Sequence, residues 1–175
     1  MYFSAESIIA PVHLLVYSTL LGTELYQSFV MVKVAYQALP RSAFTSLQKR
    51  VFPIYFRGQS ILLLCLAATV PPRGFISLGR QKKVLLPFVV AGATAALNLL
   101  TFGPRTQTLM LERVHQAPRK EKSQADAAIL SDKMRLLNRS FSRAHAMSIH
   151  LNLITIGATL WYGVLLASKL RFDNL

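Results

Sequence analysis

The stretch VLLPFVVAGATAALNLLTFGP, residues 84–104, decides the fold, because it holds 21 consecutive residues without a charge between Lys83 and Arg105. A second charge-free stretch of 25 residues lies between Arg143 and Lys169. A bilayer's hydrocarbon core needs about 20 apolar helical residues to cross it. These stretches exclude an ordinary soluble globule, a disordered chain and a β-barrel built from short alternating strands. The sequence therefore predicts an all-α protein that spans a membrane.

Two more apolar segments precede these stretches. The first ends at Leu39-Pro40, since proline disfavours helix at the residue before it, and the second ends at Pro71-Pro72. Ser42 to Val51 is expected to form a short interfacial helix, and residues 125–144 a longer amphipathic one. We predict a single domain, residues 1–175, folded as a four-transmembrane-helix bundle with an amphipathic interfacial helix before the last span. The expected spans are about residues 8–36, 52–70, 84–102 and 147–168.

The charge balance points to lipid rather than nucleic acid. The 175 residues include 20 Lys and Arg against 7 Asp and Glu, a formal charge of +13. Most cations flank the apolar segments, which suits anionic head groups, and they lack the interleaved aromatic residues that stack bases. Twelve cations fall in the loops after spans one and three and six on the opposite side. The positive-inside rule therefore predicts that both termini face away from the cytoplasm, or from the matrix.

The N-terminal residues and the single cysteine bear on the compartment. Met1 to Ser7 holds Glu6 and no Lys or Arg, so no cleavable signal peptide is expected and the first span is retained. Cys65 is alone, which excludes an intramolecular disulfide. We expect an integral protein of an intracellular membrane, with mitochondrial membranes and the endoplasmic reticulum both left open.

Polar side chains within the expected spans are candidate functional residues, because their burial in lipid is costly. His13, Tyr17, Glu24, Gln27 and Met31 fall within about 80° on one helix face. This face fits either a polar track for a proton, ion or lipid head group, or a packing surface whose polar groups hydrogen-bond between helices.

Depth in the membrane suggests partners for these groups. Glu24 is expected near mid-membrane, about 16 Å along the helix from His13, within reach of Arg57 or His150. Gln27 is expected to meet Asn98. The candidate polar cluster is therefore Glu24, Gln27, Arg57, Asn98 and His150.

A second set of residues forms a candidate lipid- or partner-binding face on the inner side. Tyr55 and Arg57 lie near the same boundary, where both residue types commonly anchor a span. The residues of this face are Arg41, Lys49, Arg50, Arg139, Arg143 and His145.

The residues offer no constellation typical of catalysis or metal binding. His13 is expected near the outer face and His145 and His150 near the inner face, too far apart to share one haem. The sequence holds no phosphate-binding loop or Gly-x-Ser-x-Gly motif. We therefore expect no metal, no cofactor, no catalytic residue and no enzymatic activity.

Several motifs in order along the chain resemble the transmembrane protein 205-like family, most of all its fungal members. The family resemblance implies a four-helix membrane domain and supplies no catalytic residues. The motifs that carry it are His13-Leu14-Leu15, Leu20-Leu21-Gly22-Thr23, Phe29, Ala38-Leu39-Pro40-Arg41, Phe44, Gln48, Phe52-Pro53-Ile54-Tyr55-Phe56, Gly103-Pro104-Arg105-Thr106, and Phe141, Arg143, His145, Ser148 and Asn152.

Two functional hypotheses follow. The first is a non-enzymatic structural, accessory or interaction subunit of a larger membrane assembly, whose basic inner face contacts anionic lipids or other membrane subunits. The second is a small transporter or exporter that uses the cluster around Glu24. A water-connected cleft that reaches Glu24 favours transport, and a dry, packed interior favours the subunit.

Overall fold

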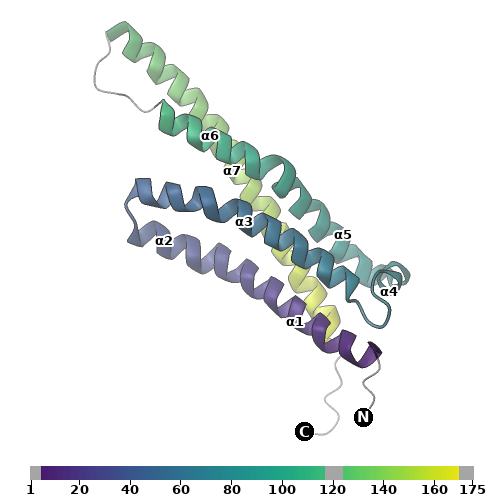
Figure 1. Ribbon diagram of the computed structural model, residues 1–175. Helices are drawn as coiled ribbons and strands as arrows, with labels where there is room; N and C mark the ends of the chain where they lie inside the picture. The colour runs from purple at the N-terminus through teal and green to yellow at the C-terminus, as the bar shows by residue number, and fades with distance from the viewer. Residues whose placement is uncertain (1–4, 117–123, 170–175) are drawn as a thin grey trace.

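The computed structural model describes residues 5–116 and 124–169, all in helices or short turns and without strands. These residues form four long helical rods, whose arrangement Figure 1 shows. The first rod joins α1 (Ala5–Leu25), the π-helix η1 (Tyr26–Met31) and α2 (Val32–Ala38), and the second is α3 (Arg41–Ala68). After the short α4 (Phe75–Arg80), the third rod joins α5 (Lys82–Leu97), the π-helix η2 (Asn98–Phe102) and α6 (Gly103–His115). The fourth rod is α7 (Gln124–Ala167).

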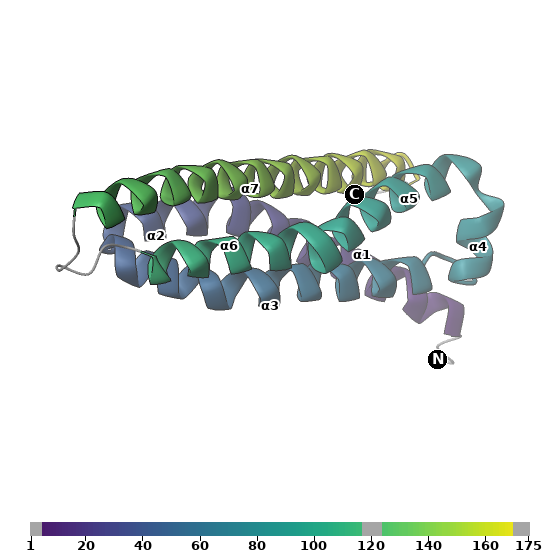
Figure 2. The ribbon, with the colours of Figure 1, turned by 90° about the horizontal axis from the view of Figure 1, so that it is seen from above.

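The rods run side by side as two hairpins (Figures 1 and 2). α1 packs against α3, and α5 packs along α7. The start of α1, the short α4 and the end of α7 lie at one end of the bundle, as expected for an even number of crossings. At the other end, the α2–α3 and α6–α7 hairpins diverge (Figure 1).

The apolar core lies toward the α4 end. Leu20 and Leu66 are 0% and 2% exposed, and Ala91 and Ala95 bring α5 close to α7 because their side chains are small. The core residues are Leu20, Leu63, Leu66, Ala67, Val70, Leu78, Val84, Ala91, Ala95, Ala158 and Tyr162.

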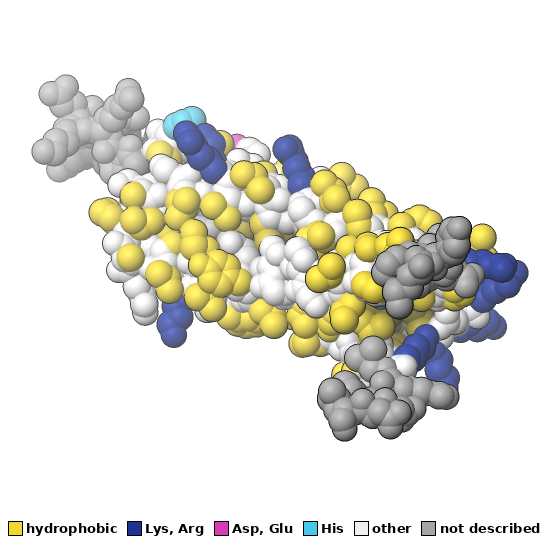
Figure 3. Space-filling view, turned by 60° about the horizontal axis from the view of Figure 1, so that its bottom comes forward, with side chains coloured by type: hydrophobic (Ala, Val, Ile, Leu, Met, Phe, Trp, Pro, Cys, Tyr) yellow, Lys and Arg dark blue, Asp and Glu magenta, His cyan; other side chains and the backbone are white. Residues whose placement is uncertain are grey.

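The outer surface of the bundle is apolar. Leu100, Ile54 and Val164 are 75%, 70% and 69% exposed, which water would penalise and lipid does not. Hydrophobic side chains cover most of the face in Figure 3, and Lys and Arg side chains project from its edges. Each of the four described rods is long and apolar enough to cross a membrane. The protein is a multi-pass helical membrane protein, as the two charge-free stretches predicted.

The prediction of a separate interfacial helix at Ser42–Val51 is wrong, because α3 runs unbroken through Pro53. Pro53 has no N–H to donate to the carbonyl of Lys49 four residues earlier. Another rod supplies the missing bond: Gln107 Nε2 of α6 donates to the Lys49 carbonyl oxygen at 3.1 Å. This tertiary contact compensates the proline, as neighbouring side chains commonly do in membrane helices.

The expected amphipathic helix before the last span is confirmed as part of α7. The 44 residues of α7 extend for about 66 Å, roughly twice the hydrocarbon thickness. Among its described side chains, Leu137 is buried and Lys133, Arg135 and Arg139 are exposed. The amphipathic segment and the span are therefore one continuous helix.

Candidate functional site

A buried polar layer crosses the middle of the bundle, centred on Glu24. Glu24 is the penultimate residue of α1 and is 0% exposed. Gln59 of α3, 1% exposed, donates from Nε2 to Glu24 Oε1 at 2.9 Å. The Thr159 hydroxyl of α7 donates to the same oxygen at 3.4 Å. The Glu24 carboxyl group thus joins three of the four rods.

The layer continues from Gln59 to Asn152 on the same face of α7. Tyr55 and Gln59 lie four residues apart on one face of α3. The Tyr55 hydroxyl donates to Asn152 Oδ1 at 2.8 Å, and Gln59 Nε2 approaches that oxygen at 3.3 Å. Asn152 Nδ2 in turn donates to Ser28 Oγ of η1 at 2.9 Å. These bonds close a network among the first, second and fourth rods.

The third rod joins α7 through separate polar contacts at nearby levels. Asn98, 0% exposed, opens η2 and donates from Nδ2 to the Ser148 carbonyl oxygen at 3.0 Å. Thr94 and Thr155 share a hydrogen bond of 2.7 Å. Hydrogen bonds between helices hold membrane bundles together where hydrophobic attraction between them is weak.

Both π-helices border this layer. Glu24 lies two residues before η1, which contains Gln27 and Ser28, and Asn98 begins η2. π-helical turns are rare and are frequent at functional sites. Their coincidence with the layer marks it as the candidate functional site.

Several buried polar atoms of the layer are left over. Glu24 Oε2, Gln59 Oε1, Asn98 Oδ1 and Gln27 Nε2 have no hydrogen-bond partner among the described residues. The one ion pair among those residues is Arg135–Asp132, on the surface of α7. Glu24 is therefore held by neutral donors within the described bundle.

The structure corrects part of the predicted polar cluster. Glu24, Gln27 and Asn98 are buried at the layer as expected, but Arg57 and His150 are exposed. The expected pairing of Glu24 with either cation is wrong: two residues beyond Arg57, Gln59 turns inward, since two residues rotate a helix by about 200°. His150 Nδ1 contacts the Ala146 carbonyl of its own helix at 2.6 Å. The expected Gln27–Asn98 pair is also wrong, since Asn98 donates to Ser148.

The sequence reasoning missed four residues that complete the layer. Tyr55 was expected as an interfacial anchor, yet it is 6% exposed and inside the network. The sequence of α7 does contain a signal for two of them. Ser148, Asn152, Thr155 and Thr159 are spaced by four, three and four residues and therefore share one helix face. The missed residues are Tyr55, Gln59, Asn152 and Thr159.

A second buried polar group lies nearer the α4 end. His13, 1% exposed, hydrogen-bonds to Thr69 Oγ1 at 2.9 Å through Nδ1 and to the Tyr162 hydroxyl through Nε2. Tyr17 meets Tyr162 edge to face at 5.9 Å between ring centroids. Gly163 permits this approach, because a Cβ there would overlap the Tyr17 hydroxyl. The predicted polar face of the first span therefore points into the bundle.

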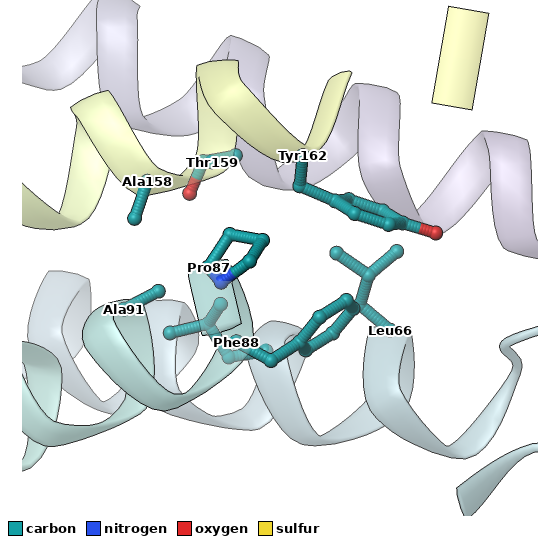
Figure 4. Close-up of a pocket in the computed structure, with 8 residues that line it drawn as sticks. Leu66, Pro87, Phe88, Ala91, Ala158, Thr159 and Tyr162 are labelled. Atoms are coloured by element: carbon teal, nitrogen blue, oxygen red, sulfur yellow. The ribbon is translucent and has the colours of Figure 1, made fainter. Parts of the chain in front are cut away.

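The packing between the two polar groups is nearly complete. A cavity of about 10 Å³ lies where Thr159 and Tyr162 face Pro87 and Phe88, with Leu66 beside them (Figure 4). This volume is at the lower limit for one water molecule, and the lining is mostly apolar. The interior beside Thr159 therefore offers no room for a larger ligand.

The predicted lipid- or partner-binding face is exposed except at one position. We call Arg41, Lys49, Arg50, Arg139 and Arg143 the basic end; all five are exposed. His145 is half-buried instead, because its ring stacks on Phe141 at 5.4 Å between centroids. Arg113 of α6 covers the same Phe141 ring at 4.5 Å, so these three residues fasten α6 to α7.

Metal-binding side chains do not gather in the part of the chain that the structure describes. Within residues 5–116 and 124–169, no three His, Cys, Asp or Glu side chains come together as metal ligands would. Cys65 is exposed on the apolar outer surface of α3.

Comparison with known proteins identifies the family. Residues 15–115 match the family described as Domain of unknown function (DUF4149), a match that runs from α1 through α6. The chain is also 43% identical over 160 residues, 91% of this chain and 90% of the relative, to "Xanthocillin biosynthesis cluster protein D" of Aspergillus fumigatus. No solved structure matches the chain. The protein belongs to the DUF4149 family.

Proposed function

We propose that this protein is a non-enzymatic accessory or interaction subunit of a larger membrane assembly. The observation that carries the proposal is the contrast in access between its two polar regions. Glu24 and Gln59 are enclosed by packing, whereas the five cations of the basic end are exposed. Buried polar groups hold the helices of the bundle together. Exposed cations are available to bind anionic lipid head groups or an acidic subunit.

The comparisons support this proposal in part. The relative carries a name that refers to a biosynthesis cluster, so we extend to this chain an accessory role in a biosynthetic pathway that uses a membrane. The predicted kinship with the transmembrane protein 205-like family stays a prediction. It agrees with the proposal because that family supplies no catalytic residues.

We also propose an intracellular membrane as its location, with mitochondrial membranes and the endoplasmic reticulum as the two candidates. Fractionation of cells that express the tagged full chain, after carbonate washing, distinguishes them by co-migration with organelle markers. Recovery in the plasma membrane would contradict the proposed location.

Native mass spectrometry of the gently extracted protein tests the proposed role. We expect the wild-type chain to retain a stoichiometric membrane partner and R139Q/R143Q to lose it, because α7 then presents two fewer cations. K82Q/K83Q is the matched control, since it removes two exposed cations at the opposite end. A chain that carries no partner in any form, or equal loss in both variants, would contradict the proposal.

A transporter is the second candidate, because Glu24 is fully buried with Oε2 lacking a partner among the described residues. Buried carboxyl groups in membrane spans commonly mark ion pathways. Thiol labelling separates the candidates: in a C65S background, T159C should resist a water-soluble reagent in a packed interior, while S131C, exposed on α7, should react. Labelling of T159C at a comparable rate would favour transport.

A further inference from the structure

An open cleft lies at the α4 end, far from the polar layer and from the basic end. It measures about 340 Å³ and borders the turn between α3 and α4 and the helix α4 itself. Its lining residues are Pro72, Arg73, Ile76, Ser77, Arg80 and Gln81.

Local geometry fixes the backbone turn that carries Arg73. Gly74 has a φ of 59°, and a Cβ there would overlap the Ala68 carbonyl oxygen, so this tight turn requires glycine. The Arg73 backbone N–H donates to Ser77 Oγ at 2.9 Å, which ties the turn to α4. Arg73 therefore enters from the turn and Arg80 from the end of α4.

A third cation reaches the cleft from the end of the chain's last span. Lys169 Nζ donates to Gln81 Oε1 at 2.6 Å, and Gln81 Nε2 donates to the Ser77 carbonyl oxygen at 3.2 Å. Arg73, Arg80 and Lys169 thus converge from two distant segments of the chain.

Among the residues that the structure describes, no acidic side chain pairs with the arginines of the cleft. The sequence has no Asp or Glu between Leu25 and Leu111. A guanidinium group binds phosphate through two parallel hydrogen bonds, which makes this cleft complementary to a phosphate-bearing anion.

Apolar side chains beside the cleft indicate where that anion comes from. Phe75 and Ile76 of α4 are 59% and 58% exposed, and they follow Arg73 by two and three residues. α4 connects two candidate spans, so it lies at the level where acyl chains meet head groups. Apolar contact and phosphate recognition side by side match a phospholipid better than a soluble phosphate ester.

We propose that the cleft between Pro72 and Gln81 binds the head group of an anionic phospholipid, with Arg73 and Arg80 on its phosphate and Phe75 and Ile76 against its acyl chains. Lys169, which donates a hydrogen bond to Gln81, adds a third positive charge beside the cleft. This site is independent of the function proposed above, because it uses the opposite end of the bundle.

The test measures binding of phosphatidylglycerol to the full chain in a neutral detergent by native mass spectrometry, with phosphatidylcholine as the uncharged comparison. We expect R73Q/R80Q to bind phosphatidylglycerol roughly thirtyfold more weakly than wild type. K82Q/K83Q, which removes two cations next to the cleft but outside its lining, should weaken binding by at most about threefold. R73K/R80K keeps the charge but loses the planar fork, so it should weaken binding by about fivefold.

Three results would overturn the proposal. The first is an equal loss in R73Q/R80Q and K82Q/K83Q, which would mean general electrostatic attraction. The second is equal retention of phosphatidylcholine and phosphatidylglycerol by wild type. The third is displacement of phosphatidylglycerol by an equal concentration of glycerol 3-phosphate, which would assign the cleft to a soluble phosphate ester.

Discussion

The polar layer around Glu24 and the α6–α7 hairpin are built on opposite principles. In the layer, polar side chains are enclosed and hydrogen-bonded across three rods. In α6, none of the 13 residues is buried, and the helix is fastened to α7 by the Arg113–Phe141–His145 contact. Polar groups are therefore enclosed in the layer, whereas in α6 they remain at the surface.

The loss of stability caused by a substitution should therefore depend on whether the side chain is enclosed rather than on whether it is polar. Removing one partner from an enclosed network leaves another buried group without a hydrogen bond, which costs about 1–3 kcal/mol. Substituting an exposed charge costs less than about 0.5 kcal/mol. The following predictions test this contrast in order of decreasing effect.

Gln59→Leu should have the largest effect. It removes the closer of the two donors to Glu24 Oε1, so we expect the free energy of unfolding to fall by about 2 kcal/mol. Thermal unfolding in detergent measures this, with an expected drop of about 5 °C in Tm. Ser60→Ala is the control, because Ser60 Oγ donates within its own helix to Phe56. Equal effects of the two substitutions would remove the layer's special role.

Gly103→Ala should have the second-largest effect, since Gly103 begins α6 directly after η2, where the layer meets the α6–α7 hairpin. A Cβ there would lie 2.6 Å from the Asn98 carbonyl oxygen and 3.3 Å from Phe56 Cδ2. We expect a loss of about 1 kcal/mol after the gain in helix propensity. At Gly157 a Cβ meets nothing within 4 Å, so Gly157→Ala should stabilise by up to about 1 kcal/mol. A Gly103→Ala variant that is more stable than wild type would show that the packing beside η2 can accommodate a Cβ at this position.

Arg113→Met should have a smaller, local effect. It removes the cation above Phe141, and we expect α6 to lose about 0.5–1 kcal/mol of local stability. Hydrogen exchange should accelerate at the amides of α6 while those of α1 stay unchanged. Arg113→Lys retains a cation and should lose less. Faster exchange throughout the bundle would mean that α6 and the layer unfold as one unit.

Arg139→Gln should have the smallest effect on folding, because Arg139 is exposed on α7. We expect the free energy of unfolding to change by less than about 0.5 kcal/mol, without a measurable change in Tm. A change as large as that of Gln59→Leu would break the contrast between the two regions.

Much of the fold followed from local pattern, but the site followed only in part. Glu24, Gln27 and Asn98 were identified because polar residues in apolar segments are conspicuous. Arg57 was included in the predicted cluster because it lies at a suitable depth along α3. Its side chain is nevertheless exposed, because it lies on the outer face of that helix. Gln59 was missed although it lies two residues away, because depth along a helix and direction around it are separate quantities.

Because length, hydropathy and proline act locally, the amino-acid order was enough to predict that the chain is helical, that it crosses a membrane and where its positive charge lies. Tertiary structure alone decided which polar groups meet. The bond from Gln107 that carries α3 through Pro53 and the bond from Gln59 to Glu24 join residues 58 and 35 positions apart. Such contacts depend on how rods rotate against one another, and that rotation is set by the packing of all four together.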